Sequence, residues 1–296
     1  GESGCGKSVT SLSVMGLVPS PPGKIVGGEI IFRQQGVEGK EENLVRASKR
    51  RMRQIRGNQI AMIFQEPMTS LDPLFTIGYQ IIEVIRNHQK ISKKAARQKA
   101  IEMLTLVGIP RPDQIVDEYP HQLSGGMRQR VMIAIATACD PEVLIADEPT
   151  TALDVTIQAQ ILELMKRLNK EKGTAIMLIT HDLGVVANMC DRVVVMYAGK
   201  VVEEGDVRSI LKNPKHPYTR GLIRSLPKLS QRDQRLYSIP GNVPKPGSIQ
   251  VGCRFAPRCQ DAFEDCYIRD PDLIQIKEGH ICRCFLYEKE AEKTHV

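Results

Sequence analysis

The chain has 296 residues, of which 42% are hydrophobic, so it is long enough to build one large domain or two ordinary domains around a real core. Its formal net charge of +7 suits an anionic ligand such as a nucleotide, a nucleic acid or a lipid surface, and selects none of them. The most apolar stretch, residues 131–139, is far shorter than the ~20 residues of a membrane-spanning helix, so no membrane span is predicted. The single cysteines Cys5, Cys139 and Cys190 are typical of a reduced, cytoplasmic protein, which argues against structural disulfides.

The predicted elements alternate between helices and strands along most of the chain. A helix is expected over residues 7–18 and strands over 27–34 and 58–65. Between these strands, residues 44–57 form a helix-like segment with six Lys/Arg side chains, most simply a solvated face. A mostly helical block, about 78–140, contains helices over 93–108 and 124–139, and is followed by strands over 142–147, 174–180 and 192–199 and an amphipathic helix over 155–173. This alternation predicts an α/β fold with a mostly parallel sheet and an inserted helical subdomain.

The composition of the sequence changes near Leu226. Beyond this residue, prolines, glycines and charged residues replace the periodic hydrophobic patterns of helices and strands. We therefore expect a main domain over residues 1–226 and a small irregular C-terminal extension over residues 227–296.

The stretch GESGCGKS, residues 1–8, matches the phosphate-loop pattern G-x-x-x-x-G-K-[ST]. Its glycines let backbone N–H groups turn toward phosphates, and the helix that follows adds its positive N-terminal end. Lys7 is expected to reach the β- and γ-phosphates, and the Ser8 hydroxyl to bind Mg²⁺. Because a phosphate loop normally follows a buried strand, an upstream segment is expected before Gly1. The predicted nucleotide-binding residues here are Gly1, Ser3, Gly4, Cys5, Gly6, Lys7, Ser8 and Val9.

Two further motifs carry the chemistry of a nucleotide. The strand VLIAD delivers Asp147 to the edge of the sheet, where it can hold the magnesium shell, and Glu148 beside it can polarise a water for attack on the γ-phosphate. The stretch LSGGMRQR places Ser124, Gly125 and Gly126 at the start of a helix, which makes a second anion site.

With these residues the chain resembles the ATP-binding-cassette (ABC) ATPases, whose signature is LSGGQ; here Met127 replaces the glutamine. The resemblance covers nearly the whole chain and implies a P-loop NTPase (RecA-like) core. It also implies that Gln65 contacts magnesium and the attacking water, that Glu148 is the catalytic base, and that His181 contacts the γ-phosphate. The family's adenine-stacking aromatic residue belongs upstream of the phosphate loop, so none is assigned.

In this family two ATPase subunits close head to tail around two ATP molecules. The resemblance implies that Ser124, Gly125, Gly126 and Asp154 complete the site of a partner subunit, identical or related. DNA-repair members of the family carry a long coiled coil inside the cassette, and no such run lies between Gln65 and Ser124. Ribosome-acting members join two cassettes in one chain, whereas this sequence has one set of motifs. The implied protein is a magnesium-dependent ATPase that binds no nucleic acid. It is expected to lie on the cytoplasmic face of the membrane with two transmembrane permease subunits and, indirectly, an extracytoplasmic solute-binding protein.

The C-terminal sequences HPYTRGLIRSLP and PGNVPKPGSIQVGCRFAPRC resemble the extension of dipeptide and oligopeptide importer ATPases. Nickel importers share much of this extension and are the alternative. The segment over residues 66–81 is expected to form the groove that receives a coupling helix of a permease. The cargo class rests on the resemblance alone, because an importer's ATPase does not touch the solute.

Five cysteines stand in the extension, and Cys253, Cys259 and Cys266 are separated by five and six residues. Zinc sites usually show closer pairs, so the spacing leaves an iron–sulfur cluster, zinc and free thiols open. The resemblance implies a [4Fe-4S] cluster. We expect it to be a structural cross-link and not an electron carrier, because no redox step belongs to ATP-driven import. Its implied ligands are Cys253, Cys259, Cys266 and Cys284, with Cys282 as an alternative to Cys284.

Overall fold

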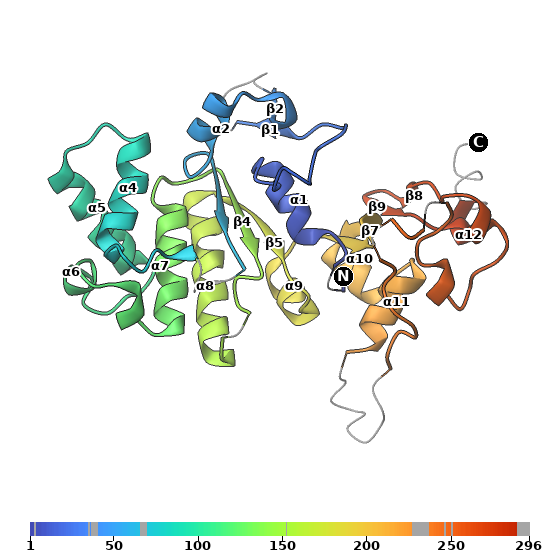
Figure 1. The fold of residues 1–296 in the computed structure, drawn as a ribbon. Helices are drawn as coiled ribbons and strands as arrows, with labels where there is room; N and C mark the ends of the chain where they lie inside the picture. Colours follow the sequence, from blue (N-terminus) through green and yellow to red (C-terminus); the bar gives the residue numbers. More distant parts are fainter. Residues whose placement is uncertain are drawn as a thin grey trace. The chain divides into compact units, whose positions relative to one another are not determined.

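The computed structural model describes residues 1–2, 4–34, 36, 41–65, 70–151, 153–226, 237–245, 247–249 and 251–288 (Figure 1). The chain forms two compact units. One is Ser8–Thr180, and the other combines Gly1–Lys7 with His181–Val296. The predicted domain division at Leu226 stays a prediction.

The unit Ser8–Thr180 is built on a parallel sheet of β3 (Ile60–Ile63), β4 (Val143–Asp147) and β5 (Ala175–Ile179), with β4 in the middle. Short β-branched and aliphatic runs form these strands, and Leu144 and Ile145 of β4 are fully buried, as expected for a parallel strand covered on both faces. The predicted α/β fold with a parallel sheet is therefore confirmed. A two-stranded antiparallel ribbon, β1 (Ile31–Arg33) and β2 (Glu41–Asn43), also lies in this unit.

Six helices of this unit begin at a side-chain cap. The side chains of Asn43, Ser48, Thr76, Ser92, Ser124 and Asp154 each accept a hydrogen bond from a backbone N–H of the turn that follows. The helices are α1 (Lys7–Val14), η1 (Leu44–Arg46), α2 (Lys49–Ile55), α4 (Ile77–His88), α5 (Lys93–Leu106), α6 (Pro112–Ile115), η2 (Pro120–Gln122), α7 (Gly125–Thr137) and α8 (Val155–Lys172). Helix α1 ends four residues earlier than the predicted helix over 7–18.

Helices α4, α5 and α6 gather at one end of the unit and form the predicted helical subdomain with α7 (Figure 1). Ile77, Ile81 and Ile85 make a fully buried stripe along α4, because residues four apart share one helix face. Gly78 lies where a Cβ atom would stand 2.5 Å from the Val116 carbonyl oxygen, so only glycine permits this approach.

The second unit contains an antiparallel sheet in the order β6 (Arg192–Tyr197), β7 (Lys200–Asp206), β9 (His280–Cys282) and β8 (Ile274–Lys277). Only the first of these strands is predicted from the sequence pattern. Its helices are α9 (Leu183–Met189), α10 (Val207–Lys212), α11 (Pro217–Arg224), η4 (Ala256–Arg258), α12 (Asp265–Ile268) and η5 (Phe285–Tyr287). The extension thus supplies two strands to a sheet that begins in the preceding part of the chain.

A buried ion-pair-like contact joins β7 to β9. The Oε1 atom of Glu203 lies 2.8 Å from Nε2 of His280, and both side chains have no solvent exposure. The Glu203 carboxylate also accepts hydrogen bonds from the backbone N–H groups of Lys215 and His216. In the same unit, Tyr197, Tyr218 and Phe255 form an aromatic cluster with ring centroids 4.6 to 5.4 Å apart. These contacts hold the extension firmly within its unit.

Within the described ranges, no helix is both long and apolar enough to cross a bilayer.

Candidate functional site

The phosphate-loop sequence forms a loop that leads directly into α1. Gly4 and Gly6 have φ angles of 75° and 99°, in the left-handed region that favours glycine. The Nζ atom of Lys7 donates hydrogen bonds to the carbonyl oxygens of Gly1 at 2.8 Å and Glu2 at 3.1 Å. The ammonium group therefore lies against the loop. Of the other predicted nucleotide-binding residues, Cys5 is buried, Ser8 is half-buried and Val9 is exposed, whereas Ser3 lies outside the described residues.

The loop is held from outside by residues distant in sequence. Gly199, in the turn between β6 and β7, donates its N–H to the carbonyl oxygen of Cys5 at 2.9 Å. The Glu2 N–H donates to the Tyr218 hydroxyl at 2.8 Å. Sequence reasoning missed Tyr218, because no local motif marks a contact made across 216 residues.

Glu148 stands at the carboxyl end of the parallel sheet, next to Asp147, which ends β4 and is buried. Glu148 has a φ of 48°, which is uncommon for a residue with a side chain, and its N–H donates to the Ile179 carbonyl oxygen at 2.9 Å. This fixed backbone places the carboxylate at the end of the strand. Strained backbone of this kind clusters at functional sites.

Two side chains contact the Glu148 carboxylate. The Nε2 atom of Gln65 lies 3.5 Å from its Oε2 atom, across 83 residues of sequence, and the Thr151 hydroxyl donates to the same oxygen at 2.9 Å. The structure thus brings together Gln65 and Glu148, two residues predicted to act on one water molecule. Thr151 was not predicted, although it follows Glu148 by three residues.

The signature residues form the N-terminus of α7. Ser124 caps the helix and accepts a hydrogen bond from the Met127 N–H at 3.4 Å. Gly125 faces open space, since no atom lies within 4 Å of the position of a Cβ atom. Gly126 faces α8, where a Cβ atom would stand 3.0 Å from Cγ2 of Ile157. Asp154 caps α8 and accepts from the Ile157 N–H at 2.9 Å, so the starts of α7 and α8 meet here.

His181 is exposed and follows β5 by two residues. The next residue, Asp182, caps α9 by accepting hydrogen bonds from the N–H groups of Gly184 and Val185. His181 and the phosphate loop belong to one unit, and Gln65, Asp147 and Glu148 to the other.

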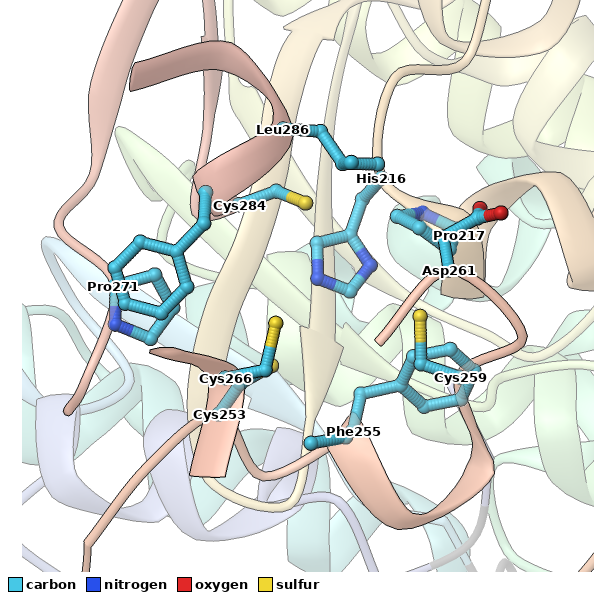
Figure 2. Close-up of a pocket in the computed structure, with 12 residues that line it drawn as sticks. His216, Pro217, Cys253, Phe255, Cys259, Asp261, Cys266, Pro271, Cys284 and Leu286 are labelled. Atoms are coloured by element: carbon cyan, nitrogen blue, oxygen red, sulfur yellow. The ribbon is translucent and has the colours of Figure 1, made fainter. Parts of the chain in front are cut away.

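Four cysteine side chains of the extension point toward one enclosed cavity (Figure 2). They are Cys253, Cys259, Cys266 and Cys284, and all are free thiols. The cavity has a volume of about 20 Å³, which is near the room that one water molecule needs. Burial, with a further contribution from nearby thiols, raises the pKa of Cys259 to about 11 and that of Cys284 to about 12, because a buried thiolate loses its hydration.

Cys282 occupies a different environment from Cys284. Cys282 ends β9 and lies opposite Glu203 of β7 in the sheet, whereas Cys284 follows the strand and lines the cavity. Burial and the Glu203 carboxylate raise the pKa of Cys282. Of the two cysteines, only Cys284 lines this cavity.

The described residues contain no group of three His, Cys, Asp or Glu side chains arranged to hold one metal ion. The structure therefore gives no support for a preformed metal centre, in contrast to the iron–sulfur cluster that the sequence analysis expects. What it shows is four thiols around a small space, of which Cys266 is buried and the other three are half-buried.

Two family models match the chain. One, described as ABC transporter, matches residues 1–151, and the other, described as Oligopeptide/dipeptide transporter, C-terminal region, matches residues 202–266. The chain belongs to the ABC transporter family. Its resemblance to the ATPase subunits of dipeptide and oligopeptide importers is thereby confirmed.

Known relatives of this ABC protein are similar over nearly its full length. The oligopeptide transport ATP-binding protein AppD of Bacillus subtilis (strain 168) is 55% identical over 290 residues, which cover 98% of this chain and 86% of the relative. The dipeptide transport ATP-binding protein DppD of the same organism is 50% identical over 292 residues, which cover 99% and 85%.

Solved structures confirm the cassette fold. The dimeric ATP-binding cassette MJ0796, in a post-hydrolysis state bound to ADP and Pi, matches with a TM-score of 0.59 and 28% identity over 70% of this chain and 83% of that chain. The cbiO1 protein of Clostridium perfringens, part of the ABC transporter complex cbiONQ, matches with a TM-score of 0.58 and 28% identity over 72% and 77%.

Proposed function

We propose that this protein is the ATP-hydrolysing subunit of an importer for dipeptides or oligopeptides. The observation that carries the cargo class is the match of residues 202–266 to the C-terminal region of oligopeptide and dipeptide transporters, in the same chain as the ABC match. The relatives named for oligopeptide and dipeptide transport support it over the full length.

The phosphate loop binds the triphosphate of ATP in this proposal. Its N–H groups and the N-terminus of α1 face the phosphates, and Gly4 and Gly6 supply the backbone angles that this requires. Lys7 exchanges its hydrogen bonds to loop carbonyl oxygens for bonds to the β- and γ-phosphates. Mg²⁺, when bound, neutralises phosphate charge, and Ser8, Asp147 and Gln65 are the residues that would hold it or its water shell.

Hydrolysis requires a group that orients and deprotonates water. Glu148 fills this role in the proposal because its carboxylate extends from the end of β4 on a fixed backbone. Gln65, whose Nε2 atom lies 3.5 Å from that carboxylate, orients the same water. The Thr151 hydroxyl donates a hydrogen bond to Oε2 of Glu148 and so helps to orient the carboxylate. His181 contacts the γ-phosphate as its charge develops.

A second ATPase subunit, identical or related, completes each site. Helix α7 has 13 residues, and Ser124 and Gly125 at its N-terminus are exposed. Such a helix N-terminus suits the binding of an anion that a partner subunit presents. Gly126 and Asp154 set the close approach of α7 and α8 beneath it. The dimeric cassette among the solved relatives supports this arrangement.

Two permease subunits, served by an extracytoplasmic solute-binding protein, receive the motion at the cytoplasmic face of the membrane. The segment that follows Gln65 carries exposed Leu74 and the stacked rings of Phe75 and Tyr79, 4.6 Å apart. Beside them lies a groove of about 610 Å³ along α4. An apolar and aromatic edge beside a groove of mixed polarity suits a short permease helix. Residues 66–69 of the predicted groove lie outside the described residues.

A [4Fe-4S] cluster bound by Cys253, Cys259, Cys266 and Cys284 forms part of the proposal. Four thiols that line one space are the donor set of such a cluster, and the placement of Cys282 in the sheet favours Cys284 as the fourth ligand. Because the cavity is small, binding a cluster requires the thiols to move apart. Iron and sulfide content on protein purified without oxygen tests this, and metal-free protein would overturn it.

The activity is tested with the complete transporter in vesicles. Glu148→Gln should lower ATP hydrolysis by roughly 10²–10⁴-fold while ATP still binds, because it removes a general base. Glu163→Gln, an exposed change on α8, is the matched control and should hydrolyse ATP normally. Uptake of labelled oligopeptide that requires ATP supports the cargo class, and uptake of nickel without peptide would overturn it.

A further inference from the structure

Arg258, in the cysteine-bearing extension, forms a salt bridge with Glu2 of the phosphate loop. Arg258 donates from Nη1 to Oε2 of Glu2 at 2.8 Å and from Nη2 to Oε1 at 3.1 Å. This is the paired geometry in which arginine binds a carboxylate most strongly. The Arg258 side chain is 4% exposed and that of Glu2 is 32% exposed, so solvent screens the pair only in part.

The guanidinium has no freedom to turn away. Its Nε atom donates to the Pro240 carbonyl oxygen at 2.8 Å, Nη2 donates to that of Ile239 at 3.3 Å, and Nη1 donates to the Tyr197 hydroxyl at 3.3 Å. The bond to Glu2 raises the pKa of Arg258, so the group remains charged. Every partner comes from the same compact unit as the loop.

Glu2 is therefore fixed at three points. Arg258 holds its carboxylate, Tyr218 holds its N–H, and Lys7 donates to its carbonyl oxygen at 3.1 Å. The second residue of the phosphate loop cannot shift without breaking a contact to the extension or to Lys7. Arg258 also neutralises a carboxylate that stands in a loop built to receive anions.

We propose that Arg258 is a positioning residue for nucleotide binding: it neutralises and fixes Glu2, so that the extension supports the phosphate loop from within the same chain. This role rests on the proposed function, since it concerns the site where ATP would bind. Arg258 stands in η4 between Cys253 and Cys259, so the loop that carries two of the four thiols also carries this contact. Without Arg258, the Glu2 carboxylate repels the phosphates and the loop loses one anchor.

The test measures binding of a non-hydrolysable ATP analogue with Mg²⁺ to the full-length protein, and KM and kcat for ATP in the complete transporter. Arg258→Gln should weaken analogue binding and raise KM by about tenfold, which corresponds to about 1.4 kcal/mol, with kcat changed less than about twofold. A purely structural defect would instead lower kcat through loss of active protein and would leave KM unchanged. Arg192→Gln removes an exposed arginine that pairs with Glu204 at 2.6 Å in the same unit and is the matched control. It should leave KM unchanged.

A double-mutant cycle with Glu2→Gln isolates the pair. Arg258→Gln should cost about tenfold in affinity when Glu2 is present and less than about twofold when Glu2→Gln is already made. Arg258→Lys, which keeps the charge and loses the paired geometry, should lie between, and serves as the test if Arg258→Gln fails to fold. An equal loss in both backgrounds, or no loss in either, would overturn the proposal. If Lys7→Ala also left affinity unchanged, the proposed nucleotide site itself would be wrong, so the two failures are distinguishable.

Discussion

Replacing Gly125 by alanine should separate the stability of the protein from its activity. Gly125 is the first residue of α7, and no atom lies within 4 Å of the position that a Cβ atom would take. Alanine therefore fits the folded structure without a clash. It also lowers the conformational entropy of the unfolded chain, which stabilises the folded state by roughly 0.5 kcal/mol at such a position. For a domain of this size the midpoint of thermal unfolding should rise by about 1–2 °C.

The same methyl group should abolish most of the ATP hydrolysis. In the proposed dimer, the open space above Gly125 receives the γ-phosphate bound to the partner subunit, and the N–H groups of the first turn of α7 contact it. A Cβ atom there holds the phosphate away from these donors. Loss of one such anion contact costs roughly 10²-fold in rate at comparable sites.

The assay compares ATP hydrolysis by the complete transporter with thermal unfolding of the same variant. Gly126→Ala is the matched comparison, because its Cβ atom would stand 3.0 Å from Cγ2 of Ile157. It should destabilise the protein by about 1 kcal/mol through overpacking, and Ile157→Ala should relieve that crowding. Normal hydrolysis by Gly125→Ala would refute the reasoning, since it would show that no phosphate occupies the space above this residue. A lowered unfolding temperature for Gly125→Ala would show that the space is filled.

Three further tests, which use four substitutions, address other parts of the structure. Asp154→Ala removes the N-cap of α8 and should lower the free energy of unfolding by about 1 kcal/mol in a denaturant titration; an unchanged midpoint would mean that the cap bond to Ile157 does not stabilise the helix. Ile145→Ala empties a fully buried position of β4 and should cost about 2–5 kcal/mol, measured in the same way; a cost below 1 kcal/mol would contradict the packing described for the sheet. Cys284→Ser should remove bound iron, whereas Cys282→Ser should retain it, and the reverse result would move the fourth ligand to Cys282.

Much of the parallel sheet could be predicted from the sequence because its signals are local. Runs such as residues 142–147 and 174–180 are short, apolar and bounded by polar turns, and such runs read as buried strands wherever they occur. The placement of Glu148 followed from the same reasoning, since the acid directly after a buried strand lies at the edge of the sheet. Gln65 could be assigned only through the family resemblance, and its 3.5 Å approach to Glu148 depends on the pairing of β3 with β4.

The extension could not be predicted in the same way. Strands β8 and β9 are four and three residues long, and their stability comes from pairing with β7 and from the buried contact of Glu203 with His280. Neither feature leaves a periodic signal in the sequence. The choice between Cys282 and Cys284 depends on where β9 ends, and strand ends are the least predictable part of a local pattern.

The contact between Glu2 and Arg258 has a consequence for the order in which the protein is made. The two residues are 256 positions apart, so a ribosome that adds roughly 5–20 residues per second completes the pair about 13–50 s after it adds Glu2. During that interval the nascent phosphate loop carries an uncompensated carboxylate and lacks the Tyr218 hydroxyl until that residue too has emerged. In our proposal, the growing chain therefore reaches the nucleotide affinity that this contact supports only after Arg258 has been added, when residues 8–180 have already been synthesised.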